Sequence, residues 1–212
     1  MTNSQRARFS AAAASIGSGV LLGLTGPAAG KLDDSAGVAV SAVFSGGWSW
    51  ACYAFVVGYL RRSKLESIVF SSLGLTVGVT AYYLFKYISP VVPPGLDAGA
   101  VEPGEGILDK ILPWTMGALV LGAPVGLLGN LARVPMWGGL LFRLTVPFIA
   151  FYETSMRLEV EASTADPVTA MTWGAVRLVA CAAALALAGH TIWSWWYGRR
   201  GVRVGKPFRP ER

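Results

Sequence analysis

The sequence predicts an all-α membrane protein, a polytopic transmembrane helical bundle with six spans. Hydrophobic residues make up 53% of the 212 residues and charged residues only 14%, whereas a soluble domain of this size carries roughly a quarter charged residues. Apolar stretches of about 20 residues, the length that a helix needs to cross the hydrocarbon core, recur along the chain. Basic residues gather in alternate connections between these stretches, as they do in proteins that cross a bilayer several times.

The six expected spans follow one another with short connections. We expect them at residues 10–31, 36–60, 65–90, 112–132, 135–157 and 168–197. Residues 91–111 are rich in Pro, Gly and acidic residues, a composition typical of a loop. Residues 1–198 therefore form one transmembrane domain, and residues 199–212 form a basic tail. The first span follows Arg6 and Arg8 as in a signal peptide, but it is long enough to cross the bilayer, and cleavage is the alternative.

The distribution of Lys and Arg predicts a protein of the cell membrane with both termini in the cytoplasm, because cytoplasmic loops carry an excess of these residues. The expected cytoplasmic side holds Arg6, Arg8, Arg61, Arg62, Lys64, Arg133 and six basic residues of the tail. The opposite side holds only Lys31, Lys110 and Arg157. Since these residues are topology signals, the net charge of +6 does not predict a nucleic-acid partner. The expected surroundings are membrane lipids.

No pattern in the sequence indicates a metal, a cofactor or a common hydrolytic site. The chain has no H-E-x-x-H, P-loop, G-x-S-x-G or dinucleotide-binding fingerprint. Cys52 and Cys181 lie inside apolar runs without metal-ligand spacing, so we expect them to pack as small core residues. Asp33 and Asp34 stand without other ligands and are interpreted as part of a solvated loop. We therefore expect neither a metal nor a cofactor.

Pairs of glycines four residues apart indicate close helix crossings, because small residues let helix backbones approach in a membrane. These pairs are Gly19–Gly23, Gly26–Gly30, Gly74–Gly78 and Gly122–Gly126. Similar Gly and Pro positions in the first and fourth spans, near Pro27 and Pro124, also suggest two inverted halves of three spans. Chance is the alternative explanation of that similarity.

Five ionisable residues inside the expected spans are candidates for function, because each costs at least ~2.5–3.5 kcal/mol in the bilayer. They are Lys86, Arg143, Glu153, Arg177 and His190. At about 1.5 Å per residue, Arg143 and Arg177 lie near the middle of the bilayer, and Glu153 lies near its outer face. Glu153 could pair with Arg177 or with Arg157 at i+4. An ion pair that only joins the last two spans is the structural alternative to a polar binding pocket.

Aromatic residues accompany these positions and lead to a hypothesis about function. They are Trp48, Trp50, Tyr82, Tyr83, Tyr152 and Trp173. Aromatic faces stabilise cations, and a carboxylic acid in apolar surroundings can serve as a general acid. Glu153 would then protonate an isoprenoid epoxide or alkene, Arg143 and Arg177 would orient its polar or anionic head, and the aromatic residues would line the cavity. A small inverted-repeat transporter or channel and a non-catalytic accessory subunit are the alternatives.

The chain resembles a family of small polytopic actinobacterial membrane proteins of unknown function. The likeness rests on the run from Gly19 to Pro27, on the basic hairpin Leu60–Lys64 and on the pair Tyr82–Tyr83. More distantly, in size and aromatic content, it resembles the membrane-integrated terpene cyclases of meroterpenoid pathways. Those enzymes have seven spans and acidic residues that initiate cyclisation, whereas this chain shows six spans and one candidate acid. The resemblance implies a membrane-bound cyclase with Glu153 as the initiating acid.

Overall fold

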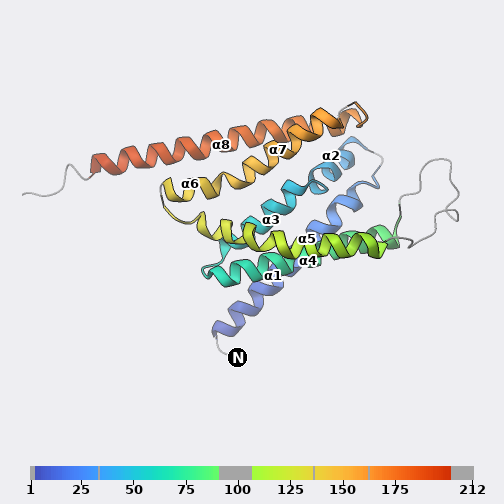
Figure 1. Ribbon diagram of the computed structural model, residues 1–212, viewed down its shortest axis with the longest axis horizontal. Coiled ribbons are helices and arrows are strands. Elements are labelled where there is room, and N and C mark those ends of the chain that lie inside the picture. Colours follow the sequence, from blue (N-terminus) through green and yellow to red (C-terminus); the bar gives the residue numbers. More distant parts are fainter. Residues whose placement is uncertain (1–2, 33, 91–106, 136, 162, 202–212) are drawn as a thin grey trace, which may run out of the picture.

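The computed structural model describes residues 3–32, 34–90, 107–135, 137–161 and 163–201, and these residues form helices without any β-strand. The helices are α1 (Asn3–Ala29), α2 (Ser35–Phe44), α3 (Gly47–Leu60), α4 (Lys64–Ile88), α5 (Ile107–Leu131), α6 (Trp137–Arg143), α7 (Thr145–Val160) and α8 (Pro167–Gly201). Figure 1 shows them as an elongated bundle. The expected loop at residues 91–111 lies outside the described residues as far as residue 106, as do Asp33 and the tail beyond residue 201.

Four helices are long and apolar enough to cross a membrane, and the expected all-α membrane fold is confirmed to that extent. The four segments are Phe9–Ala29, Lys64–Ile88, Asp109–Leu131 and Pro167–Tyr197. The second expected span is a broken helix, because α2 and α3 are bent by 59° at residues 45–46, and together they would make a fifth span. The fifth expected span is also divided, at Leu144, into α6 and α7. Six spans and the orientation of the termini stay predictions.

The break between α2 and α3 has a local cause in the sequence Ser45-Gly46-Gly47. Residue Gly46 is extended at φ −74° and ψ 143°, and α3 starts directly after it. The hydroxyl of Ser49 donates a 2.6 Å hydrogen bond to the carbonyl of Gly46, so this carbonyl stays satisfied outside the helix. The chain can therefore change direction at Ser45-Gly46-Gly47 while the carbonyl of Gly46 keeps a hydrogen-bond partner in Ser49.

The glycine pairs lie where helices cross, as the sequence predicts. Gly19 and Gly23 of α1 lie against Gly74 and Gly78 of α4, and a Cβ on Gly23 would collide with the carbonyl of Gly78. On the next turn of α1, a Cβ at Gly26 would lie 3.0 Å from the hydroxyl of Ser45 in the α2–α3 connection. These crossings hold α1, α2 and α4 together through direct backbone approach.

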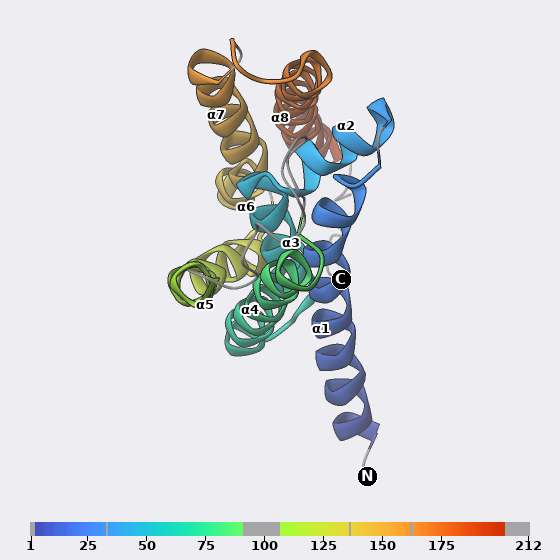
Figure 2. The same ribbon diagram turned by 90° about the vertical axis from the view of Figure 1, so that its right-hand side faces the viewer.

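The helices form two groups that meet at α2 and α3. Helix α4 packs along α1 and α5, and α3 packs against both α4 and α5. Helices α7 and α8 run side by side and reach the first group where α7 meets α3 and α8 meets α2 (Figure 2). In the described residues, α5 and α7 do not pack against each other along their lengths. In the first expected half, the first and third spans (α1 and α4) pack along each other. In the second half, the corresponding helices α5 and α8 do not pack along each other within the described residues. The two halves are therefore arranged differently and give no support to an inverted repeat.

Candidate functional site

A cavity of about 630 Å³ lies between α3, α4, α5 and α7. The wall of the cavity is mostly aliphatic and aromatic. The cavity lies in the half of the bundle that contains the start of α3 and the ends of α4 and α7. The lining residues are Ser45, Gly47, Trp50, Ala51, Ala54, Leu75, Val79, Tyr82, Tyr83, Trp114, Gly117, Ala118, Leu121, Val125, Ile149, Glu153 and Arg157. Ligand pockets usually have such a volume and such an apolar wall with few polar groups.

Aromatic rings from α3 and α4 form one side of this cavity. Trp50 and Tyr82 meet edge to face with ring centroids 6.1 Å apart, and Tyr83 meets Tyr82 in the same way at 5.2 Å. The Nζ atom of Lys86 lies 4.8 Å from the Tyr82 ring centroid, within the range of a cation–π contact. Three of the aromatic residues singled out in the sequence, Trp50, Tyr82 and Tyr83, thus lie on one cavity wall.

The polar corner of the cavity is built on Glu153. Its carboxylate accepts hydrogen bonds from the backbone N–H groups of Gly47 at 2.9 Å and Trp48 at 2.6 Å. It also accepts one from Nε of Arg157 at 3.1 Å, and its side chain is 15% exposed. The first N–H groups of a helix have no partner inside the helix and carry partial positive charge. Glu153 therefore caps α3 from another helix and ties α7 to the break in the second span.

This arrangement bears on the expected role of Glu153 as a general acid. An ionised carboxylate only accepts hydrogen bonds, and the oxygens of Glu153 accept three N–H groups. The contacts shown are those of a capping carboxylate, in which Oε1 accepts two N–H groups and Oε2 accepts one.

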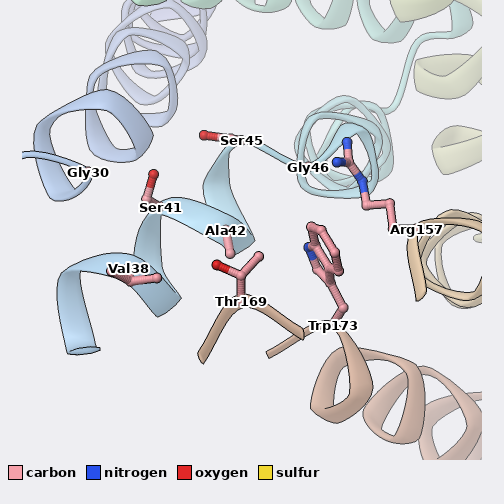
Figure 3. A pocket seen from close by; sticks show the side chains of 9 residues that line it. All are labelled: Gly30, Val38, Ser41, Ala42, Ser45, Gly46, Arg157, Thr169 and Trp173. Atoms are coloured by element: carbon pink, nitrogen blue, oxygen red, sulfur yellow. The ribbon is translucent and has the colours of Figure 1, made fainter. Parts of the chain in front are cut away.

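Arg157 lies between this cavity and a second, smaller pocket of about 330 Å³. Its Nη1 atom donates to Glu161 at 3.3 Å, and its guanidinium carbon lies 5.5 Å from the centroid of the buried Trp173 ring. Figure 3 shows the guanidinium and the indole on the same side of this pocket. The pocket is lined by Gly30, Val38, Ser41, Ala42, Ser45, Gly46, Arg157, Thr169 and Trp173.

Four predicted site residues lie elsewhere. Arg143 donates from Nε to the carbonyl of Ala132 at 2.8 Å, so it binds the end of α5 rather than the cavity. Arg177 lines neither pocket and makes no hydrogen bond or ion pair within the described residues. Tyr152 is 63% exposed on the outer side of α7, where it stacks on Phe148.

The fourth of these residues, Trp48, does not line the cavity and contributes only its backbone N–H to Glu153. The structure thus brings Glu153, Trp50, Tyr82 and Tyr83 to the larger cavity and Trp173 to the smaller pocket. Among the described residues, no three His, Cys, Asp or Glu side chains are grouped to hold a metal ion.

The sequence interpretation missed Arg157 and Trp114 as lining residues. Arg157 was counted among the charges outside the membrane, although α7 continues to Val160 and keeps it in the helix. The regular spacing of Glu153, Arg157 and Glu161 was the available signal, because residues four apart share one face of a helix.

Comparison with models of known protein families, with curated proteins and with solved structures gives no match for this chain. Statements about its function therefore rest on the geometry of the cavity and its polar corner.

Proposed function

We propose that this chain is an integral membrane protein that takes up a lipid-like, isoprenoid-type molecule from the bilayer. The observation that carries the proposal is the cavity of about 630 Å³ between α3, α4, α5 and α7, with its aromatic wall and its single polar corner at Glu153 and Arg157. An apolar chain would remain in apolar surroundings there, while the polar end would find hydrogen-bond partners.

The arrangement of helices supports access from the side. Within the part of the chain that the structure describes, α5 and α7 do not pack along each other, so no extended helix–helix contact closes the cavity between them. The surfaces on either side are apolar and outward-facing, with Leu121 of α5 63% exposed and Phe148 of α7 67% exposed. Such surfaces suit lipid tails, so a ligand could move from the bilayer to the cavity without crossing water.

For the topology we propose six spans with both termini in the cytoplasm. Two of these spans would be the broken pairs α2–α3 and α6–α7. The α3–α4 and α5–α6 connections lie towards the same end of the bundle as the C-terminal end of α8 (Figure 1). The first carries basic residues at positions 61, 62 and 64 and the second carries Arg133, which supports a common cytoplasmic side. The aromatic residues Trp193, Trp196 and Tyr197 near that end of α8 are placed as an interfacial belt would be.

Cyclisation of an isoprenoid epoxide or alkene in this cavity is the second candidate function. The observation that favours it is the presence of Glu153 and the Trp50–Tyr82–Tyr83 cluster on the same cavity. The aromatic faces could stabilise carbocations, and a proton on Glu153 would sit on Oε2, which accepts one N–H group whereas Oε1 accepts two. Mass spectrometry of extracts from cells supplied with linear and epoxy-isoprenoids tests this candidate. A new cyclic isomer that disappears with Glu153→Gln supports it, and no new product from folded protein argues against it.

Binding is tested by filling the cavity. A Cβ added at Gly117 meets no atom within 4 Å, and Gly117 lies on the cavity wall, so we expect the ring of Gly117→Phe to occupy the cavity. Gly174 of α8 is equally free but lines neither pocket, so Gly174→Phe is the matched control. Binding of radiolabelled farnesol to protein in nanodiscs should fall at least ~10-fold in Gly117→Phe and stay unchanged in the control. Equal binding in both variants would remove the support for the cavity.

A further inference from the structure

The two pockets share part of their walls, and this points to a ligand with two chemically different ends. Ser45 and Arg157 line both the larger, mostly apolar cavity and the smaller pocket. A molecule with its chain in the larger cavity would therefore bring its head to Arg157, on the side where the smaller pocket begins. The chemistry around Arg157 then selects the head.

Arg157 has hydrogen-bond donors to spare. A guanidinium has five N–H groups, of which Nε–H is directed to Glu153 and one on Nη1 to Glu161. The Nη2 atom makes no hydrogen bond within the described residues. The contact with Trp173 holds the guanidinium plane in place, so the remaining N–H groups are positioned for an acceptor atom.

The charge of Arg157 is already compensated. Glu153 and Glu161 both form ion pairs with it, at 3.1 and 3.3 Å. A phosphate or diphosphate head would add negative charge beside two carboxylates that one arginine must already balance. A cationic head would lie against the guanidinium itself. An uncharged head that accepts hydrogen bonds is compatible with both restrictions.

Hydroxyl groups complete the smaller pocket. Ser41, Ser45 and Thr169 line it, and their hydroxyls make no hydrogen bond within the described residues. In Figure 3 the hydroxyls of Ser41 and Ser45 lie on the α1 side of the pocket, and Arg157 and Trp173 lie on the opposite side. Neutral hydroxyls can both donate to and accept from an oxygen-bearing head.

We infer that the ligand of this protein is an isoprenoid-type molecule with an uncharged oxygen-containing head, such as an alcohol, ether, epoxide or ketone, bound by Arg157 and the hydroxyls of the smaller pocket. This inference rests on the proposed binding function, and it assigns the head-group site that the sequence had placed at Arg143 and Arg177. It specifically excludes prenyl phosphates as the preferred ligands.

A matched series of probes with one chain and different heads tests the inference. Farnesol, farnesyl methyl ether, farnesyl phosphate, farnesylamine and the hydrocarbon farnesene compete against radiolabelled farnesol on protein in nanodiscs, and binding to Gly117→Phe is subtracted. Farnesol and the ether should bind at least ~10-fold more tightly than the hydrocarbon, because a hydrogen bond from a charged donor is worth about that factor. The phosphate should bind less tightly than farnesol because of the charges of Glu153 and Glu161, and the amine because of the charge of Arg157. The variant Ser41→Ala/Thr169→Ala should reduce farnesol binding and leave farnesene binding unchanged.

The outcomes separate this inference from the proposed function. If the phosphate or the amine binds most tightly, or if the hydrocarbon binds as well as farnesol, the head-group assignment is overturned while binding in the cavity stands. If no probe binds better to the native protein than to Gly117→Phe, the proposed function itself fails, and the inference fails with it.

Discussion

Glu153 accepts a hydrogen bond from the backbone N–H of Gly47, a residue 106 positions earlier in the chain. The bond joins α7 to the first turn of α3 and thereby connects the two groups of helices. A carboxylate at this place also complements the positive end of α3. Glycine at position 47 is part of the arrangement, because a Cβ there would lie 3.1 Å from Oε2 of Glu153. The polar corner of the cavity and the break in the second span are thus one structural feature.

Loss of this carboxylate should destabilise the protein. Glu153→Ala leaves the N–H groups of Gly47 and Trp48 without their acceptor and Arg157 without one of its partners. Helix caps contribute about 0.5–2 kcal/mol, so we expect a loss of free energy of unfolding in that range. Thermal unfolding in a mild detergent measures it. Glu159→Ala, an exposed acid on the same helix, is the control, and equal stability of the two variants would show that the cap is unimportant.

The two glycines Gly23 and Gly17 should respond in opposite ways to alanine. An alanine usually stabilises a helix by about 1 kcal/mol relative to glycine, and at Gly17 nothing lies within 4 Å of the added Cβ. At Gly23 the Cβ would collide with the carbonyl of Gly78. We expect Gly17→Ala to keep or raise the unfolding temperature and Gly23→Ala to lower it. A Gly23→Ala variant as stable as Gly17→Ala would contradict the close crossing of α1 and α4.

Arg143 should matter for stability and not for ligand binding. Its Nε and Nη2 atoms donate to the carbonyls of Ala132 and Val134 at 2.8 and 3.2 Å, beyond the end of α5 and outside the cavity. Arg143→Gln should therefore lower the unfolding temperature and leave the dissociation constant of farnesol within about twofold. A large loss of binding without a loss of stability would return Arg143 to the binding site.

Labelling of single cysteines should reveal the orientation. In a background with Cys52 and Cys181 replaced by Ala, we expect Ser63→Cys to be protected from an impermeant maleimide in intact cells, because the proposed topology puts the basic hairpin in the cytoplasm. Ser163→Cys, in the connection between α7 and α8, should be labelled. The reverse pattern would invert the topology, and labelling of both or neither would refute the proposed arrangement of spans.

The sequence predicted the apolar helices well because hydropathy alone decides which segments can cross a bilayer. It did not predict the two breaks. The segment from Ser35 to Leu60 is apolar enough as a whole to cross a membrane, and the break within it depends on a long-range partner, Glu153, for the new helix start. No local pattern contains that contact.

The same limitation explains the misplaced side chains. The expected depth of Arg143 assumed one straight helix, whereas α6 ends at Arg143 and lets it reach back to α5. Trp48 and Trp50 are two residues apart and point about 200° apart around a helix, so only one of them can face the cavity. Side-chain direction in α3 could have been inferred from periodicity, but which face meets the cavity depends on the packing of α4, α5 and α7.

The most direct test of the cavity is photo-crosslinking in native membranes. Cells that express the protein would be supplied with a photoreactive farnesol analogue and irradiated, and the labelled peptides would be identified by mass spectrometry. Our account predicts labels within residues 114–125 of α5 and 75–83 of α4, lost in Gly117→Phe and retained in Gly174→Phe. Labels confined to the outer faces of α5 and α8, and unchanged by Gly117→Phe, would mean that the protein only touches surrounding lipid and has no ligand in the cavity.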